Sequence, residues 1–133
     1  MTRTLTLTIP GHPATQGSKR HVGGGRLVEM DRKLPAWRAA VAAAAHPHTR
    51  TPHWEPLDGP LSVETVIYLP RPARPKFDAP ATPGDLDKYL RALGDALTLA
   101  RLIRDDARIV HWDATKTYAT HTVGAVITIT ETP

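Results

Sequence analysis

Apolar and polar residues alternate with a period of two in several parts of the chain, as in β-strands that are buried on one face. Residues 4–9 alternate strictly, and residues 61–69 alternate again; both segments are rich in β-branched side chains. Pro10 and Gly11 end the first of these segments. Two more strands are predicted at about 107–118 and 122–130, joined as a hairpin. The pattern therefore predicts about four strands.

Two other segments repeat their apolar residues at helical spacing. The first begins at Pro35, which suits the first turn of a helix, and continues through Val41 to Ala45. Pro47 is predicted to stop it, with a loop from residue 46 to 60. In the second segment Asp85 occupies the N-cap position. Its apolar face comprises Leu86, Tyr89, Leu90, Leu93, Ala96 and Leu97.

The order of these elements is strand, helix, strand, helix, strand, strand. This order predicts an α+β fold in which two main helices pack on one mixed β-sheet of about four strands. A length of 133 residues suits a single domain, so we expect residues 1–133 to form one.

Two segments between these elements are polar and basic. Residues 12–25 contain Lys19 and Arg20 and end in three consecutive glycines. Residues 70–84 contain five prolines together with Arg71, Arg74 and Lys76. Because proline breaks regular structure, the second segment is predicted to be an extended, mobile loop. Both segments could be simple solvated surface, or they could bind a polyanion.

Composition limits the classes of function. The chain has no cysteine, which excludes disulfides and thiolate metal sites. It has a net charge of +4 and a pI of about 9.8, which favours a polyanionic partner without establishing one. No apolar run is long enough to span a membrane, and the first ten residues alternate rather than forming a signal peptide. We therefore expect a soluble, cytoplasmic protein with no membrane partner.

Acidic residues interrupt this basic chain at two places. Asp85 and Asp87 lie at the start of the second helix, and Asp105 and Asp106 lie just before a strand. Carboxylate oxygens are the ligands that magnesium prefers, and phosphodiester cleavage uses such ions to activate water and stabilise the leaving oxygen. Alternatively, Asp85 and Asp87 only cap the helix and complement its dipole, and Asp105 and Asp106 form a solvated turn.

The acidic residues and their neighbours resemble the RusA family of Holliday-junction resolvases. The family pattern is an acidic pair opening a helix, a basic residue one turn later, then Asp-Ala-Leu, a second acidic pair and a lysine on the following strand. It matches a set that runs in order along this chain: Asp85-Leu86-Asp87, Arg91, Asp95-Ala96-Leu97, Asp105-Asp106 and Lys116. The resemblance is strongest from about residue 84 to 116 and extends weakly to the first strand and first helix.

This resemblance implies a DNA endonuclease that makes paired symmetric nicks in four-way junctions. It implies catalysis by Asp85, Asp87, Asp106 and Arg91, with the three aspartates binding magnesium or, alternatively, manganese. It also implies a homodimer, whose twofold symmetry would match that of the junction. There are two departures, because Lys88 replaces the usual Asn and Arg91 the usual Lys. Arginine does not deprotonate in proteins, so the second departure puts turnover in question.

Basic residues on loops and beside the acids are the expected contacts to DNA phosphates. This set comprises Lys19, Arg20, Arg71, Arg74, Lys76, Lys88, Arg91 and Lys116.

Other residues that could carry chemistry are given structural interpretations. Asp95 is assigned a structural role. Trp37 and Trp112 are assigned to the core rather than to base stacking, while Trp54, in a loop, could do either. The histidines lack the helical spacing and the supporting carboxylates of a zinc site. The three glycines are not followed by the Gly-Lys-Ser/Thr of a nucleotide-binding loop, so no nucleotide cofactor is expected.

The sequence thus predicts a metal-dependent enzyme that cuts branched DNA. Two alternatives remain open. One is a catalytically impaired protein of the same fold that binds branched DNA, and the other is an unrelated basic interaction protein whose acidic residues are only caps.

Overall fold

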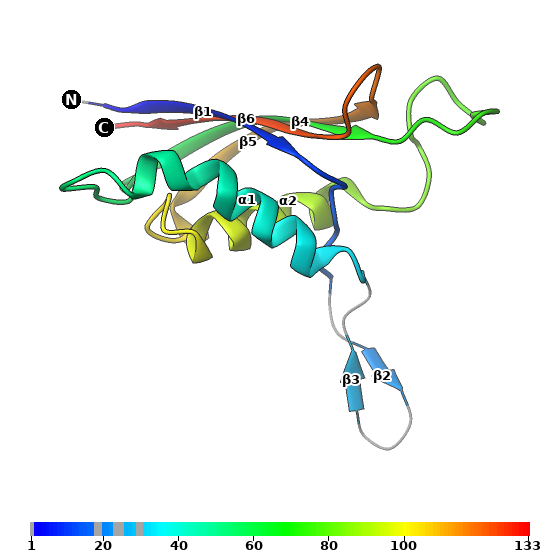
Figure 1. Cartoon of the computed structure of the whole chain (residues 1–133), viewed down its shortest axis with the longest axis horizontal. Coiled ribbons are helices and arrows are strands. Elements are labelled where there is room, and N and C mark those ends of the chain that lie inside the picture. The colour runs from blue at the N-terminus through cyan, green and yellow to red at the C-terminus, as the bar shows by residue number, and fades with distance from the viewer. Residues whose placement is uncertain (1, 18–19, 23–25, 29–30) are drawn as a thin grey trace.

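Four long strands form a mixed sheet, and the two helices cover one of its faces (Figure 1). The computed structural model describes residues 2–17, 20–22, 26–28 and 31–133. The sheet contains β1 (Thr4–Pro10), β4 (Leu61–Leu69), β5 (Ile109–Tyr118) and β6 (Gly124–Glu131). The helices are α1 (Leu34–Thr49) and α2 (Leu86–Leu99), and a 3-10 turn, η1 (Asp106–Arg108), precedes β5. The predicted α+β class and the mixed sheet are confirmed.

The strands are ordered β1-β6-β4-β5, so the predicted hairpin of the last two strands is wrong. β4 lies between them, parallel to β5 and antiparallel to β6. The reason is that β4, α2 and β5 form a crossover unit, in which successive strands run parallel. Residues 119–123 then cross the end of β4, where the amide of Ala119 donates to the carbonyl of Leu69 at 2.8 Å.

The first helix does not stop at Pro47 as predicted, because that proline lies inside its last turn. Proline removes one backbone donor, and near the C-terminal end this loss affects only one hydrogen bond. The turn is completed beyond it, since the amide of Arg50 donates to the carbonyl of His46 at 3.0 Å. The hydroxyl of Thr51 also caps the carbonyl of His48 at 2.7 Å.

Residues 12–25 were expected to be a loop, but they include one strand of a pair. β2 (Arg20–Val22) and β3 (Arg26–Val28) form an antiparallel ribbon that projects from the main body (Figure 1). Asp31 anchors the base of this ribbon, because its carboxylate accepts hydrogen bonds from the amides of Thr15 and Lys33, each at 2.8 Å. These bonds lower the pKa of Asp31 against the opposing effect of burial.

The core lies between the helices and the inner face of the sheet. It includes Ile67 and Ile127 from the strands and Trp37 and Leu93 from the helices, each fully buried or nearly so. The assignment of Trp37 to the core is therefore confirmed. Outward positions of β1 and β6 are largely threonines, and the hydroxyls of Thr6 and Thr128 are hydrogen-bonded at 3.0 Å.

Trp54 lies at the margin of the core, half-buried, with its indole N–H donating to the carbonyl of Arg101 at 3.0 Å. In the part of the chain that the structure describes, no helix has the length and apolar character needed to cross a membrane.

Candidate active site

The first turn of α2 presents two of the three expected metal ligands. Asp85 is the N-cap residue, and its carbonyl accepts the amides of Lys88 and Tyr89 at 3.0 and 3.1 Å. Its carboxylate makes no capping hydrogen bond and is 64% exposed. The carboxylate instead lies 3.6 Å from the ammonium of Lys88. Capping by the side chain therefore does not account for an acid at position 85.

Asp87 and Asp106 line one cavity of about 430 Å³ between α2 and the start of β5. Arg91 and Lys88 supply positive charge to its wall, and Trp112 supplies an aromatic ring. The remaining lining residues are Leu90, Gly94 and Ile109. Trp112 is half-buried and borders this cavity, so its assignment to the core holds only in part.

Gly94 on α2 allows the corner that carries Asp106, which is the turn just before β5, to approach the helix. A Cβ atom at Gly94 would lie 3.2 Å from the Cβ of Asp106, which is closer than most real contacts of this kind. The opposite side of the corner is held by Asp58, whose carboxylate lies 2.8 Å from Arg108 and 3.5 Å from Arg104. The sequence offered no periodic or motif signal for Asp58.

Carboxylates gather around Asp106. Burial raises the pKa of Asp106, and a hydrogen bond with Asp105 together with the charges of Asp105 and Asp95 raises it further. The Asp95 carboxylate pairs with Arg38 at 3.1 Å, and the same guanidinium nitrogen donates to Gln16 at 3.0 Å. Asp95 thus makes a structural contact as expected, and it also adds negative charge near the cavity. Sequence reasoning did not single out Arg38 or Gln16.

The structure brings two of the three expected ligands to one cavity and leaves the third at its edge. Asp85 does not line the cavity, and no group of three or more His, Asp or Glu side chains close enough to hold a metal occurs among the described residues. The available donors are nevertheless hard carboxylate oxygens, two beside a cavity and one exposed on the adjacent turn. This donor chemistry suits magnesium or manganese, which keep several water ligands.

The basic residues expected at DNA occupy three different places. Arg71, Arg74 and Lys76 are exposed on the loop from residue 70 to 84, which folds around a cavity of about 390 Å³ lined in part by Arg74 and Lys76. Arg20 begins β2, whereas Lys19 lies outside the described residues.

Lys116 lies on β5, and its ammonium donates to the carbonyls of Thr82 and Gly84 at 3.0 and 2.7 Å.

The two projecting segments leave the same end of the molecule. Figure 1 shows the loop of residues 70–84 and the β2–β3 ribbon on either side of the N-terminal end of α2. Backbone contacts agree with this view, because the amide of Gln16, near the base of the ribbon, donates to the carbonyl of Lys88 at 3.0 Å. The acidic residues at the start of α2 therefore lie between two segments that contain basic residues.

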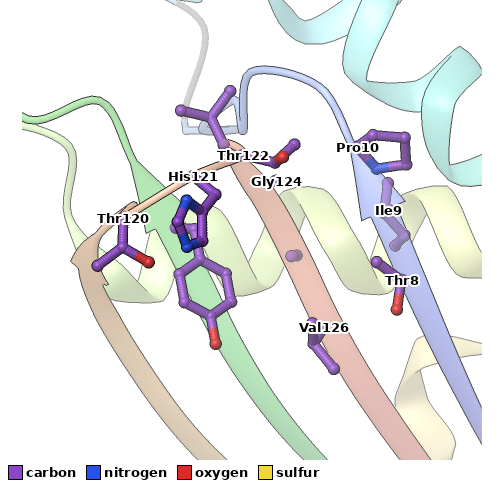
Figure 2. A pocket seen from close by; sticks show the side chains of 11 residues that line it. Thr8, Ile9, Pro10, Thr120, His121, Thr122, Gly124 and Val126 are labelled. Atoms are coloured by element: carbon purple, nitrogen blue, oxygen red, sulfur yellow. The ribbon is translucent and has the colours of Figure 1, made fainter.

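Another cavity, of about 280 Å³, lies at one end of the sheet, where β1, β4 and β6 meet the turn before β6 (Figure 2). His121 and Thr8 are among its lining residues, and none of the lining residues is acidic. It therefore lacks the carboxylates that metal-dependent cleavage needs.

Comparison with known families gives an independent result. The family model described as endodeoxyribonuclease RusA matches residues 10–130, which is most of the chain. No curated protein matches the chain.

Proposed function

Because the chain belongs to the RusA family of endodeoxyribonucleases, we propose that it is a metal-dependent Holliday-junction resolvase that makes paired, symmetric nicks in branched DNA. In this proposal residues 1–133 form one endonuclease domain that acts as a homodimer. The observation that carries the proposal is the shared cavity of Asp87 and Asp106, with Arg91 in its wall.

The carboxylates would hold one or two magnesium ions, with manganese as the alternative. Asp87 and Asp106 already line the cavity, and Asp85 completes the set once its carboxylate leaves Lys88. When bound, the metal supplies an activated water and stabilises the leaving oxygen. Burial is the main cause of the raised pKa of Asp106, and the neighbouring carboxylates of Asp105 and Asp95 raise it further; a divalent cation would offset this second effect.

The chain's own side chains have three tasks in this reaction. The aspartates fix the position of the ions, and Arg91 neutralises the phosphate that enters the cavity. The exposed cations Arg71, Arg74 and Lys76 hold the neighbouring DNA backbone through phosphate contacts. Arginine suffices at position 91 if its role is electrostatic, because guanidinium binds phosphate with two parallel hydrogen bonds.

A homodimer would place two such sites on a substrate that itself has twofold symmetry. A C2 dimer presents each site to an equivalent strand, which is the geometry that symmetric nicking requires. Branched DNA is the substrate in this proposal because RusA-family endonucleases act on junctions, whose twofold symmetry a C2 dimer would match.

One observation favours a second candidate, a branched-DNA-binding protein with impaired catalysis. Lys88, which replaces the family's usual Asn, lies 3.6 Å from the Asp85 carboxylate and therefore competes with a metal for it.

A nicking assay on a synthetic mobile four-way junction separates the possibilities. We expect magnesium-dependent nicks in the junction and little cutting of a linear duplex of the same sequence. Tight junction binding without nicks in magnesium or manganese would favour the impaired protein. Equal binding to junction and linear DNA, together with no metal binding, would indicate a basic protein without selectivity for branched DNA and contradict both.

A further inference from the structure

The loop of residues 70–84 leads directly into α2, where Asp85 and Asp87 lie. One side chain of β5 is hydrogen-bonded to the last residues of this loop. The ammonium of Lys116 donates to the carbonyl of Thr82 at 3.0 Å and to that of Gly84 at 2.7 Å. Gly84 immediately precedes the N-cap residue Asp85. Residues 82–85 form the joint between the loop and α2. The ammonium of Lys116 therefore connects this joint to β5, an edge strand of the sheet.

A second contact restricts the same joint. Gly84 has a φ of +108°, and a Cβ atom there would lie 2.7 Å from the hydroxyl of Tyr89. Tyr89 is itself buried, so the backbone of Gly84 passes closely over a fixed ring. The joint is thus held against α2 by packing and against β5 by Lys116.

The helix dipole does not explain the position of Lys116. Cations are disfavoured near the N-terminal end of a helix, where the dipole is positive. The ammonium nevertheless lies there, half-buried, with two backbone oxygens as partners. Since two carbonyl acceptors hold it, Lys116 differs from the exposed cations of the loop, and it does not have the geometry of a free phosphate contact.

From these contacts we propose that Lys116 is a positioning residue, which fixes the first turn of α2 and so sets Asp85 and Asp87 for catalysis. This inference rests on the proposed nuclease function. Loss of the ammonium frees residues 82–84 from β5 and lets the first turn fray, and small displacements of catalytic groups reduce rates strongly. Lys116 touches neither the metal nor DNA in this role.

The test compares Lys116→Met, which keeps the length of the chain but removes its donors, with Lys116→Arg, which keeps a cation. The exposed residue Arg50, at the far end of α1, provides the control Arg50→Met for the loss of one positive charge. Each protein is measured for single-turnover nicking at saturating enzyme, for junction affinity over a salt series and for Mn²⁺ affinity without DNA.

Lys116→Met should nick between about ten-fold and a hundred-fold more slowly. Its junction affinity should change less than about two-fold, with the same dependence on salt, because no phosphate contact is lost. Mn²⁺ should bind more weakly. Lys116→Arg should restore most of the rate, and Arg50→Met should behave as the unmodified protein.

Amide hydrogen exchange supplies a readout that does not depend on activity. The amides of Lys88 and Tyr89 bond to the carbonyl of Asp85, and they should exchange at least about ten-fold faster in Lys116→Met because the turn frays. The amide of Ala100, which bonds to Ala96 at the other end of α2, should be unchanged and serves as the internal control.

Unchanged exchange and an unchanged nicking rate in Lys116→Met would overturn the proposal. An unchanged rate at saturation with a salt slope shallower by about 0.9 would also overturn it, and would assign Lys116 to phosphate binding. If Lys116→Met does not fold, Lys116→Gln, which keeps an N–H donor, carries the test; unfolding of both would make the role one of global stability. If the unmodified protein never nicks DNA, the nuclease proposal fails, and exchange alone still decides whether Lys116 fixes the turn.

Discussion

Individual carboxylates carry the proposed chemistry, and their separate replacement tests it. Asp85→Asn, Asp87→Asn and Asp106→Asn should each abolish nicking, because each removes a ligand from the metal. Junction affinity should stay the same or increase, since repulsion of phosphate is reduced. The measurement is nicking and binding of one labelled junction by each variant.

Asp95→Asn is the matched control, because Asp95 pairs with Arg38 and does not line the cavity. It should reduce nicking far less. Normal cutting by all three of the other variants would show that the site is elsewhere.

Lys88 stands where the pattern that this sequence resembles usually has Asn, and its ammonium lies 3.6 Å from the Asp85 carboxylate. Lys88→Asn should raise the affinity for Mn²⁺ about two- to five-fold, because it frees Asp85 from an exposed ion pair worth up to about 1 kcal/mol. Titration of the metal-free protein with Mn²⁺ measures this change. Weaker Mn²⁺ binding by the variant would mean that Lys88 does not compete for the site.

The ion pair of Arg3 and Glu131, neither of which lines the cavity of Asp87 and Asp106, should make stability depend on pH at low pH. The guanidinium of Arg3 donates to both oxygens of Glu131, at 3.0 and 2.9 Å, and the Asp58 amide donates at 3.0 Å. These bonds lower the pKa of Glu131 from 4.5 to about 2, so their contribution is complete above pH 4.5 and is lost as the pH falls toward 2.

The corresponding variant is Glu131→Gln. It should be less stable at pH 7 by about 1–2 kcal/mol, which is below the roughly 3 kcal/mol equivalent of the full shift because Arg3 is 39% exposed. Urea unfolding at a series of pH values should show the difference from the unmodified protein shrinking below pH 4.5. A difference that stays constant down to pH 2 would contradict this assignment. Glu64→Gln, on an exposed position of β4, is the control.

At the scale of elements, the basic loop of residues 70–84 is expected to hold DNA. Replacing Arg71, Arg74 and Lys76 together with Ala should make the log–log salt dependence of binding shallower by about 2 to 3, at about 0.9 for each lost phosphate contact. Cleavage-site preference should survive at low salt, because phosphate contacts carry no base information. Fluorescence anisotropy over a salt series measures the slope.

A double variant with Arg50→Ala and Arg101→Ala tests whether the loss of positive charge alone changes the slope, since both residues are exposed and lie at the C-terminal ends of α1 and α2. Its slope should be unchanged. If the salt dependence of binding is unchanged in the loop variant, the loop is a solvated linker that makes no contact with DNA.

The elements with a strong local pattern were predictable from sequence. The alternation at residues 61–69 and the apolar face from Leu86 to Leu97 match β4 and α2 closely. The pairing of β5 and β6 with β4 was not predictable, because strand order depends on contacts between residues far apart in the chain. The end of α1 was not predictable from Pro47 either. A proline in the last turn costs the helix only one backbone hydrogen bond and therefore does not end it.

The candidate site was predictable in part, for the same reason. The acidic pattern and the family resemblance singled out Asp87 and Asp106, which the structure brings to one cavity. The register of β4 and β5 shifts between Leu61 and Ser62, which leaves Val110 between the paired residues Ile109 and His111. This bulge puts Ile109 and Trp112, three residues apart, in the same cavity, which simple alternation does not allow. Trp112 was therefore assigned to the core instead of the site.

For the whole molecule, paired nicking needs two copies of the chain acting on one junction. A single chain supplies one set of the proposed metal ligands, with Asp87 and Asp106 lining a cavity beside α2. Light scattering should find a homodimer at working concentration. A monomer would count against paired symmetric nicking, although not against endonuclease chemistry.

The most direct test uses a supercoiled plasmid that extrudes a single cruciform, which is a four-way junction with two pairs of opposed, equivalent strands. With magnesium, we expect linear plasmid as the main product, because a dimer nicks both strands of one pair in one encounter. Asp106→Asn should bind the plasmid and leave it supercoiled. Intact plasmid after incubation of the unmodified protein with magnesium or manganese, or nicked circles as the only product, would contradict the account.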